Sequence, residues 1–204
     1  MNRSSISVDF SMSDNEISKC EEYINGVDKM LEWGAGGSTL YFSSMVGKFV
    51  SIENDKGWYN KLLSDINDNV ELHYVHQHED KYDEELDKNA FDILEGDGAN
   101  VSEFIYDGKI INWVTRGRID WHCYMDYIRH PINLSHRDYG VILVDGRARA
   151  MCAYVAKDLL KDDGHLLFHD FNNRPYYHGI LKWYEIIDTQ GSLAVLTKKI
   201  RGNS

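Results

Sequence analysis

Two polar runs carry residue types that can activate a hydroxyl group for reaction. Asp145 and Arg147 follow one continuous apolar run, and His169, Asp170 and Asn172 follow a second. Because parallel strands end at the same edge of a sheet, we expect the two carboxylates to lie close together. Neighbouring carboxylates are most stable when they share a cation or a proton. The two runs therefore predict an acceptor-activating site.

A glycine-rich turn is the second chemical feature of the sequence. It follows the short apolar strand predicted at 30–33 and contains Gly34, Gly36 and Gly37. Glycines let the backbone turn sharply and approach a ligand closely. Ser38 and Thr39 follow where a helix would begin, so we expect N–H groups and hydroxyls to face the ligand there. The turn predicts a nucleotide-like cofactor.

The spacing around this turn selects among cofactors. A dinucleotide fingerprint would need glycine at the position of Thr39. The next predicted strand ends in Glu53, whose carboxylate would accept hydrogen bonds from both ribose hydroxyls. The arrangement resembles motif I and the acidic motif II of class I S-adenosylmethionine (SAM)-dependent methyltransferases. The resemblance implies SAM as cofactor, bound by Glu32, Gly34, Ala35, Gly36, Gly37, Ser38, Thr39, Glu53 and Asp145.

Short motifs on the acceptor side carry a second resemblance. The run from Val144 to Arg147, with the later run from Leu167 to Pro175, resembles sugar and polysaccharide O-methyltransferases, including the plant glucuronoxylan type. This implies methyl transfer to a hydroxyl of a carbohydrate acceptor, a glycan or a sugar. The implied catalytic residues are Asp145, Arg147, His169 and Asp170.

Metal use stays open at this point. The chain is also similar to catechol-type and macrolide-sugar O-methyltransferases, in which comparable acids and a neighbouring Asn or Asp hold Mg²⁺. That likeness implies Mg²⁺ or Mn²⁺ on Asp145, Asp170 and Asn172, although Phe171 stands directly after Asp170. A bound cation would lower the pKa of the acceptor hydroxyl. Alternatively, His169 or Asp170 acts alone as a general base.

Simpler readings of the same residues remain beside these. Asp145 could cap the helix that follows it, and His169 could pair with a backbone group. Arg147 and Arg149 could form ion pairs with carboxylates in a chain this acidic.

The elements that must position these residues alternate between strand and helix. Buried apolar runs predict strands at 30–33, 48–52, 70–75, 139–144 and 165–168. Periodicity and capping residues predict helices at 14–25, 39–46, 55–66, 150–160 and 176–183. A hairpin of 184–188 and 193–197, turned at Gly191, closes the chain. This order predicts an α/β fold with a doubly wound, mostly parallel seven-stranded sheet, helices on both faces and a terminal β hairpin.

The segment 77–139 interrupts this alternation before the fourth strand. It is too long for a structureless connection, so we expect an inserted lid with its own structure that contributes acceptor specificity. A helix from Trp121 to Arg129, stopped by Pro131, is predicted within it. His76 and His78 near its start lack a third ligand, so no metal is expected there. The chain 1–204 is predicted to form one domain.

Composition limits the partners. The formal net charge of −11 repels a phosphate backbone, so a small-molecule or oligosaccharide acceptor is favoured over nucleic acid. The 3 cysteines form no C-x-x-C pair, which indicates reduced thiols. The sequence lacks the apolar run of a signal peptide or membrane span, which predicts a cytoplasmic protein. The oligomeric state is not indicated.

Other functions remain as alternatives. The acceptor could be another small hydroxylated metabolite. Thr39 and the closing hairpin disfavour a nucleotide-dependent oxidoreductase or sugar-nucleotide enzyme. Intact acids at strand ends, Glu53, Asp145 and Asp170, argue against a non-catalytic cofactor-binding module.

Overall fold

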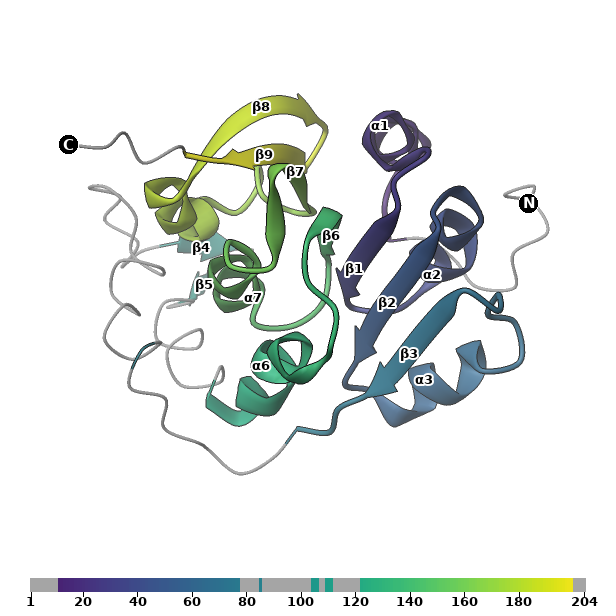
Figure 1. The fold of residues 1–204 in the computed structure, drawn as a ribbon. Helices are drawn as coiled ribbons and strands as arrows, with labels where there is room; N and C mark the ends of the chain where they lie inside the picture. Colours follow the sequence, from purple (N-terminus) through teal and green to yellow (C-terminus); the bar gives the residue numbers. More distant parts are fainter. Residues whose placement is uncertain (1–10, 78–84, 86–103, 107–108, 112–121, 200–204) are drawn as a thin grey trace.

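A seven-stranded, mostly parallel sheet forms the centre of the protein (Figure 1). The computed structural model describes residues 11–77, 85, 104–106, 109–111 and 122–199. The strand order is β3-β2-β1-β6-β7-β9-β8, and β9 and β8 join antiparallel. The predicted fold class is therefore confirmed. The strands are β1 (Lys29–Trp33), β2 (Lys48–Glu53), β3 (Val70–Tyr74), β6 (Tyr139–Val144), β7 (Leu160–Phe168), β8 (Tyr184–Gln190) and β9 (Leu193–Lys198).

The chain changes direction across the sheet between β1 and β6. It runs outward from β1 to β2 and β3, and then returns to place β6 on the other side of β1. Trp33, the last residue of β1, pairs with Ile52 on one side and Val144 on the other. Ligands of open α/β sheets bind beyond the carboxyl ends of the strands at such a switch point.

Helices cover both faces of the sheet. Leu31, Val50 and Ile142 pack in one buried cluster with α6 and α7, whereas Met30 and Phe49 pack in another with α1 and α2. This alternation follows from the period of two along each strand. The helices are α1 (Asp14–Ile24), α2 (Gly37–Phe42), α3 (Lys56–Leu62), α6 (Met125–Asn133) and α7 (Arg149–Ala156), with 3₁₀ segments η2 (Ser43–Met45), η3 (His122–Tyr124) and η4 (Pro175–Lys182). Among the described residues, no helix has the length and apolar character needed to cross a membrane.

Helix α1 begins where the sequence predicted it. Ser13 and Glu16 form a capping box, in which each side chain bonds the backbone N–H of the other residue. Ile17, Cys20 and Ile24 then bury one helical face against the sheet. The first turn of α1 is thereby fixed close to the strand ends.

The predicted stop of a helix at Pro131 is wrong. Helix α6 continues through Pro131 to Asn133. Proline cannot donate the N–H that would bond the carbonyl of Tyr127 four residues earlier. The indole N–H of Trp33 donates to that carbonyl instead, at 3.0 Å. A tertiary contact thus replaces the missing helical bond.

Other boundaries also differ from the prediction. Strand β7 begins at Leu160, before the start predicted at 165, so Gly164 lies within the strand. A Cβ on Gly164 would stand 2.9 Å from the Leu160 side chain, and the pairing register with β6 shifts beside it. Helix α3 ends at Leu62, four residues before the end predicted at 66, and Leu63, which was predicted to lie within the helix, is 47% exposed.

The segment before β6 is described only in part. Strands β4 (Phe104–Tyr106) and β5 (Lys109–Ile111) form a separate antiparallel pair. The lid predicted at 77–139, and the start of its helix at Trp121, otherwise lie largely outside the described residues. Its described end, from η3 to α6, packs against the sheet and α7.

Candidate functional site

The carboxyl ends of β1 and β6 touch through two glycines at the switch point. Gly34 has φ of +100°, which favours glycine, and a Cβ on it would lie 2.5 Å from the backbone of Gly146. The glycine turn after β1 and the Asp145–Arg147 run after β6 are therefore adjacent walls of one site.

A cavity of about 560 Å³ opens between these walls. Its lining comes from six regions of the chain: the segment before α1, the glycine turn, the end of β2 with α3, the residues after β3, η3, and the run after β6 with the start of α7. The residues include Ser11, Met12, Gly34, Ala35, Gly36, Gly37, Ser38, Glu53, Trp58, Gln77, Tyr124, Asp145, Gly146, Arg147 and Arg149.

Gly36 leaves open space at the cavity wall. A Cβ there would have one described neighbour within 4 Å, the indole nitrogen of Trp58 at 3.6 Å. That indole donates a hydrogen bond to the carbonyl of Ala35 and so braces the turn from the side of α3. The backbone of the turn is therefore accessible to a ligand.

Glu53 places a buried carboxylate at the same cavity. Its side chain accepts backbone hydrogen bonds from Asn54 at 2.8 Å and Asp55 at 2.6 Å. Burial raises the pKa of Glu53 above its ordinary value, against the opposing effect of these bonds. Such a carboxylate gains from a ligand that donates further hydrogen bonds, as a ribose does.

The hydroxyls of Ser38 and Thr39 were expected to face a ligand, but in the structure they point to Glu32. Both donate to the carboxylate of Glu32, which also accepts from Ser51 at 2.8 Å. Glu32 is fully buried in β1 and absent from the cavity lining. The hydrogen bonds of Ser38 and Thr39 to Glu32 therefore support the glycine turn from inside the protein.

Glu32 makes the stability of the fold depend on pH. Burial raises its pKa from 4.5 to about 7, although three hydroxyl bonds act in the opposite direction. Between these pH values the unfolded chain releases a proton that the folded protein keeps, so stability is lost as pH rises. When the pH is raised from 5 to 8, the difference in unfolding free energy between Glu32→Gln and wild type should shift in favour of the variant by about 2–3 kcal/mol, as measured by urea unfolding. Equal differences at both pH values would contradict the raised pKa.

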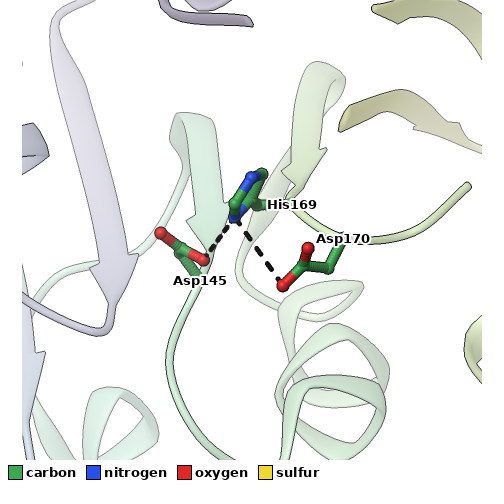
Figure 2. A group of neighbouring side chains, drawn as sticks. All are labelled: Asp145, His169 and Asp170. Carbon is green, nitrogen blue, oxygen red and sulfur yellow. Dashed lines mark hydrogen bonds and ion pairs between the residues drawn. The ribbon is translucent and has the colours of Figure 1, made fainter. Parts of the chain in front are cut away.

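Asp145 lies on the cavity wall formed after β6, and its carboxylate faces the ring of His169 (Figure 2). Its Oδ1 atom lies 2.8 Å from His169 Nδ1 and 3.1 Å from Arg149, and its Oδ2 accepts the hydroxyl of Ser11. Burial acts to raise the pKa of Asp145, but the His169 hydrogen bond and the Arg149 charge outweigh it and lower the pKa. Asp145 does not cap α7, whose N-cap is Ala148 with no side-chain cap bond.

Arg149 joins the two aspartates that the sequence predicted to be neighbours. It pairs with Asp145 and, at 3.0 Å, with Asp170, and it also donates to the carbonyl of His169. Arg174 adds a second pairing to Asp170 at 2.8 Å. Asp170 has φ of +61°, a strained conformation for a residue other than glycine. The shared cation of the two carboxylates is thus a guanidinium.

The remaining predicted residues lie apart from the cavity or at its rim. His169 is 5% exposed and is not among the lining residues of the cavity; its Nδ1 bonds the lining residue Asp145, and its Nε2 faces Glu16 at 3.9 Å. Arg147 is exposed at the rim. Asn172 donates to carbonyls of Gly191 and Leu193 and thereby holds the hairpin turn.

A metal ion fits this cluster poorly. Ligand atoms of Asp145, His169 and Asp170 lie within 4.8 Å of one another, which alone would suit a cation. The carboxylates of Asp145 and Asp170 are already balanced by the guanidinium groups of Arg149 and Arg174. A divalent cation would have to displace Arg149, and the amide of Asn172 is engaged elsewhere. At His76, Nδ1 pairs with the Tyr74 hydroxyl, and His78 lies outside the described residues.

Two parts of the site were not foreseen. Ser11 and Glu16 reach it from the segment around the start of α1, and Trp58 lines it from α3. For Arg149 the simpler reading is confirmed, because this residue forms ion pairs with two carboxylates.

Solved structures share this fold. A methyltransferase-like protein from Silicibacter pomeroyi DSS-3 has a TM-score of 0.64 and 21% identity, covering 95% of this chain and 90% of that one. An O-methyltransferase from Bacillus cereus, in complex with SAH, has a TM-score of 0.55 and 15% identity, and the match covers 95% of this chain and 84% of that one. Precorrin 8w decarboxylase from Methanobacterium thermoautotrophicum has a TM-score of 0.54 and 10% identity, and the match covers 95% of this chain and 94% of that one. No protein-family model and no curated protein matches the sequence significantly. The chain therefore has the Rossmann-like methyltransferase fold.

Proposed function

We propose that the protein is a SAM-dependent methyltransferase that transfers a methyl group to a hydroxyl acceptor. The observation that carries this proposal is the cavity at the switch point, which joins the glycine turn and Glu53 to the ionised Asp145. The methyltransferase fold supports it, and so does the motif resemblance.

The cofactor half of the cavity suits SAM. The open space at Gly36 admits a ligand against the backbone of the turn, and the Glu53 carboxylate can accept ribose hydroxyls. Ala35, Gly37 and the backbone of Ser38 complete this wall. When bound, SAM supplies the methyl group on its sulfonium.

The acceptor half centres on Asp145. Bound SAM would supply its methyl group to the acceptor oxygen and leave as the thioether, so the acceptor would have to lose its O–H proton. A carboxylate of lowered pKa is a weak base, so Asp145 orients the hydroxyl and takes its proton late, when the methylated oxygen is strongly acidic. His169 and Arg149 hold Asp145, and Asp170 holds Arg149. This route needs no metal ion.

The acceptor is a carbohydrate in this proposal. Its support is the likeness of the runs after β6 and β7 to sugar and polysaccharide O-methyltransferases. Tyr124, which comes from the segment before β6, lines the cavity and supplies a flat face for a sugar ring. The segment 77–139 would then contribute acceptor specificity.

Calorimetric titration with SAM, SAH, NAD and a UDP-sugar tests the cofactor. We expect heats of binding with the first two ligands alone. Transfer of labelled methyl from SAM to a panel of glucuronosides, glucosides and catechols then tests the acceptor. Binding of NAD or the UDP-sugar without SAM would overturn the proposal, and methylation of catechols alone would overturn the carbohydrate assignment.

Removal of the Glu53 carboxylate tests the ribose contact. We expect Glu53→Ala to weaken SAM binding by about 1–3 kcal/mol, the range for hydrogen bonds to a charged group. Glu71→Ala is the matched control, because Glu71 lies on the neighbouring strand β3 outside the cavity lining. Calorimetry should show the loss in the first variant and unchanged affinity in the second. Equal affinities would exclude the contact.

A further inference from the structure

Glu16 has an unusual environment for the first turn of a helix. Its side chain is buried, with 6% exposure, although it belongs to the capping box of α1. Four hydrogen bonds reach its carboxylate, two from Ser13 and two from Ser192, at 2.7 to 2.8 Å. Burial acts to raise the pKa of Glu16, but these bonds outweigh it and lower the pKa to about 2. Glu16 is thus a buried, ionised carboxylate.

Capping of α1 does not account for all of these bonds. A capping box needs the contacts with Ser13 alone. The Oε1 atom instead binds both the N–H and the hydroxyl of Ser192, in the turn between β8 and β9. A Cβ on the neighbouring Gly191 would lie 2.9 Å from that oxygen, so the turn approaches closely. The Glu16 carboxylate is thus held both by Ser13, three residues earlier, and by Ser192 in the hairpin turn, and the two contacts together fix its orientation.

The fixed carboxylate stands at one end of a row of three side chains. Glu16 Oε2 lies 3.9 Å from His169 Nε2, and His169 Nδ1 lies 2.8 Å from Asp145 Oδ1. Each nitrogen of the ring therefore faces a carboxylate. Asp170 Oδ2 is 4.0 Å from the same Nδ1, and Arg149 binds the His169 carbonyl at 2.7 Å. The row leads from the buried Glu16 to Asp145 at the cavity wall.

We propose that Glu16 is a positioning residue of the acceptor site, which orients the His169 ring so that Nδ1 is directed at Asp145. Its effect on methyl transfer rests on the proposed function. Its effect on the His169 ring needs neither cofactor nor acceptor. The two can therefore be tested separately.

Proton NMR of the full chain tests the positioning directly. The ring N–H of His169 is buried and hydrogen-bonded to a carboxylate, so we expect a downfield signal that exchanges slowly with water and is absent in His169→Asn. In Glu16→Gln this signal should move upfield and exchange faster. Glu22→Gln, a control on the exposed side of α1, should leave it unchanged. An unchanged signal in a folded Glu16→Gln protein would overturn the proposal.

A double-mutant cycle on turnover separates positioning from simple stabilisation. We expect Glu16→Gln to lower kcat by about tenfold to hundredfold with SAM affinity unchanged. In the His169→Asn background the same substitution should cause no further loss, because both act through one ring. Losses that multiply would overturn the proposal. An altered NMR signal in a protein that neither binds SAM nor transfers methyl would instead reject the proposed function alone.

Discussion

Valine in place of Gly36 should abolish SAM binding while the protein stays folded. The described surroundings leave room for a Cβ, since its neighbour within 4 Å is the Trp58 indole nitrogen at 3.6 Å. The φ of Gly36 is −175°, an extended value that any residue adopts. The valine side chain would instead fill the part of the cavity in which we propose that the cofactor binds. We expect no measurable heat in calorimetry with SAM.

Two variants make this result specific. Gly36→Ala should retain weakened binding, because it adds a single methyl group. Gly26→Asn is the matched control, since Gly26 has no described neighbour within 4 Å of a Cβ and asparagine tolerates its positive φ. Thermal unfolding checks the fold in each case. SAM affinity unchanged in Gly36→Val would remove the glycine turn from the site.

Asp145→Asn should lower turnover by about a hundredfold or more, the range for loss of a group that handles the proton. The change keeps the shape of the side chain but removes the charge that the acceptor proton needs. SAM affinity should change far less, because the turn and Glu53 carry most of that binding. Asp162→Asn, at an exposed carboxylate paired with Lys198, is the control and should transfer methyl normally.

The methyl-transfer assay also distinguishes a metal-assisted mechanism from one in which Asp145 acts without a metal ion. With Arg149 as the shared cation, EDTA should not reduce methyl transfer and Mg²⁺ should not increase it. Because the pKa of Asp145 lies below its ordinary value of 3.8, activity that depends on its charge should fall only in strongly acid solution. Loss with EDTA and recovery with Mg²⁺ would restore the metal mechanism. Wild-type turnover in Asp145→Asn would remove this residue from catalysis.

The sequence was sufficient for the parts of the fold that local pattern determines. Continuous apolar runs located the parallel strands, because strands buried on both faces need apolar residues throughout. The glycines and Glu53 were expected at the ends of neighbouring strands, and they do line one cavity there. Ser13 and Glu16 marked the start of α1 for the same reason: capping is a contact between near neighbours.

Contacts between distant segments could not be predicted in this way. The hydroxyls of Ser38 and Thr39 bind Glu32 because β1 buries an acid beneath the turn, and no periodicity shows which side of a turn a hydroxyl will take. Pro131 stays within a helix because Trp33 satisfies the free carbonyl. Ser11 reaches Asp145 because α1 docks on the sheet through its apolar face. Each depends on tertiary packing.

The contact between Gly34 and Gly146 also determines when the site can assemble during synthesis. The glycine turn and Glu53 leave the ribosome early, within the β1-α2-β2 unit. The facing wall comes from β6, which is made only after the long segment that precedes it. A nascent chain that ends before β6 therefore has one wall of the cavity and a glycine with no backbone packed against it. A ligand that contacts both walls would bind the completed sheet better than an incomplete chain, so it would stabilise finished molecules selectively.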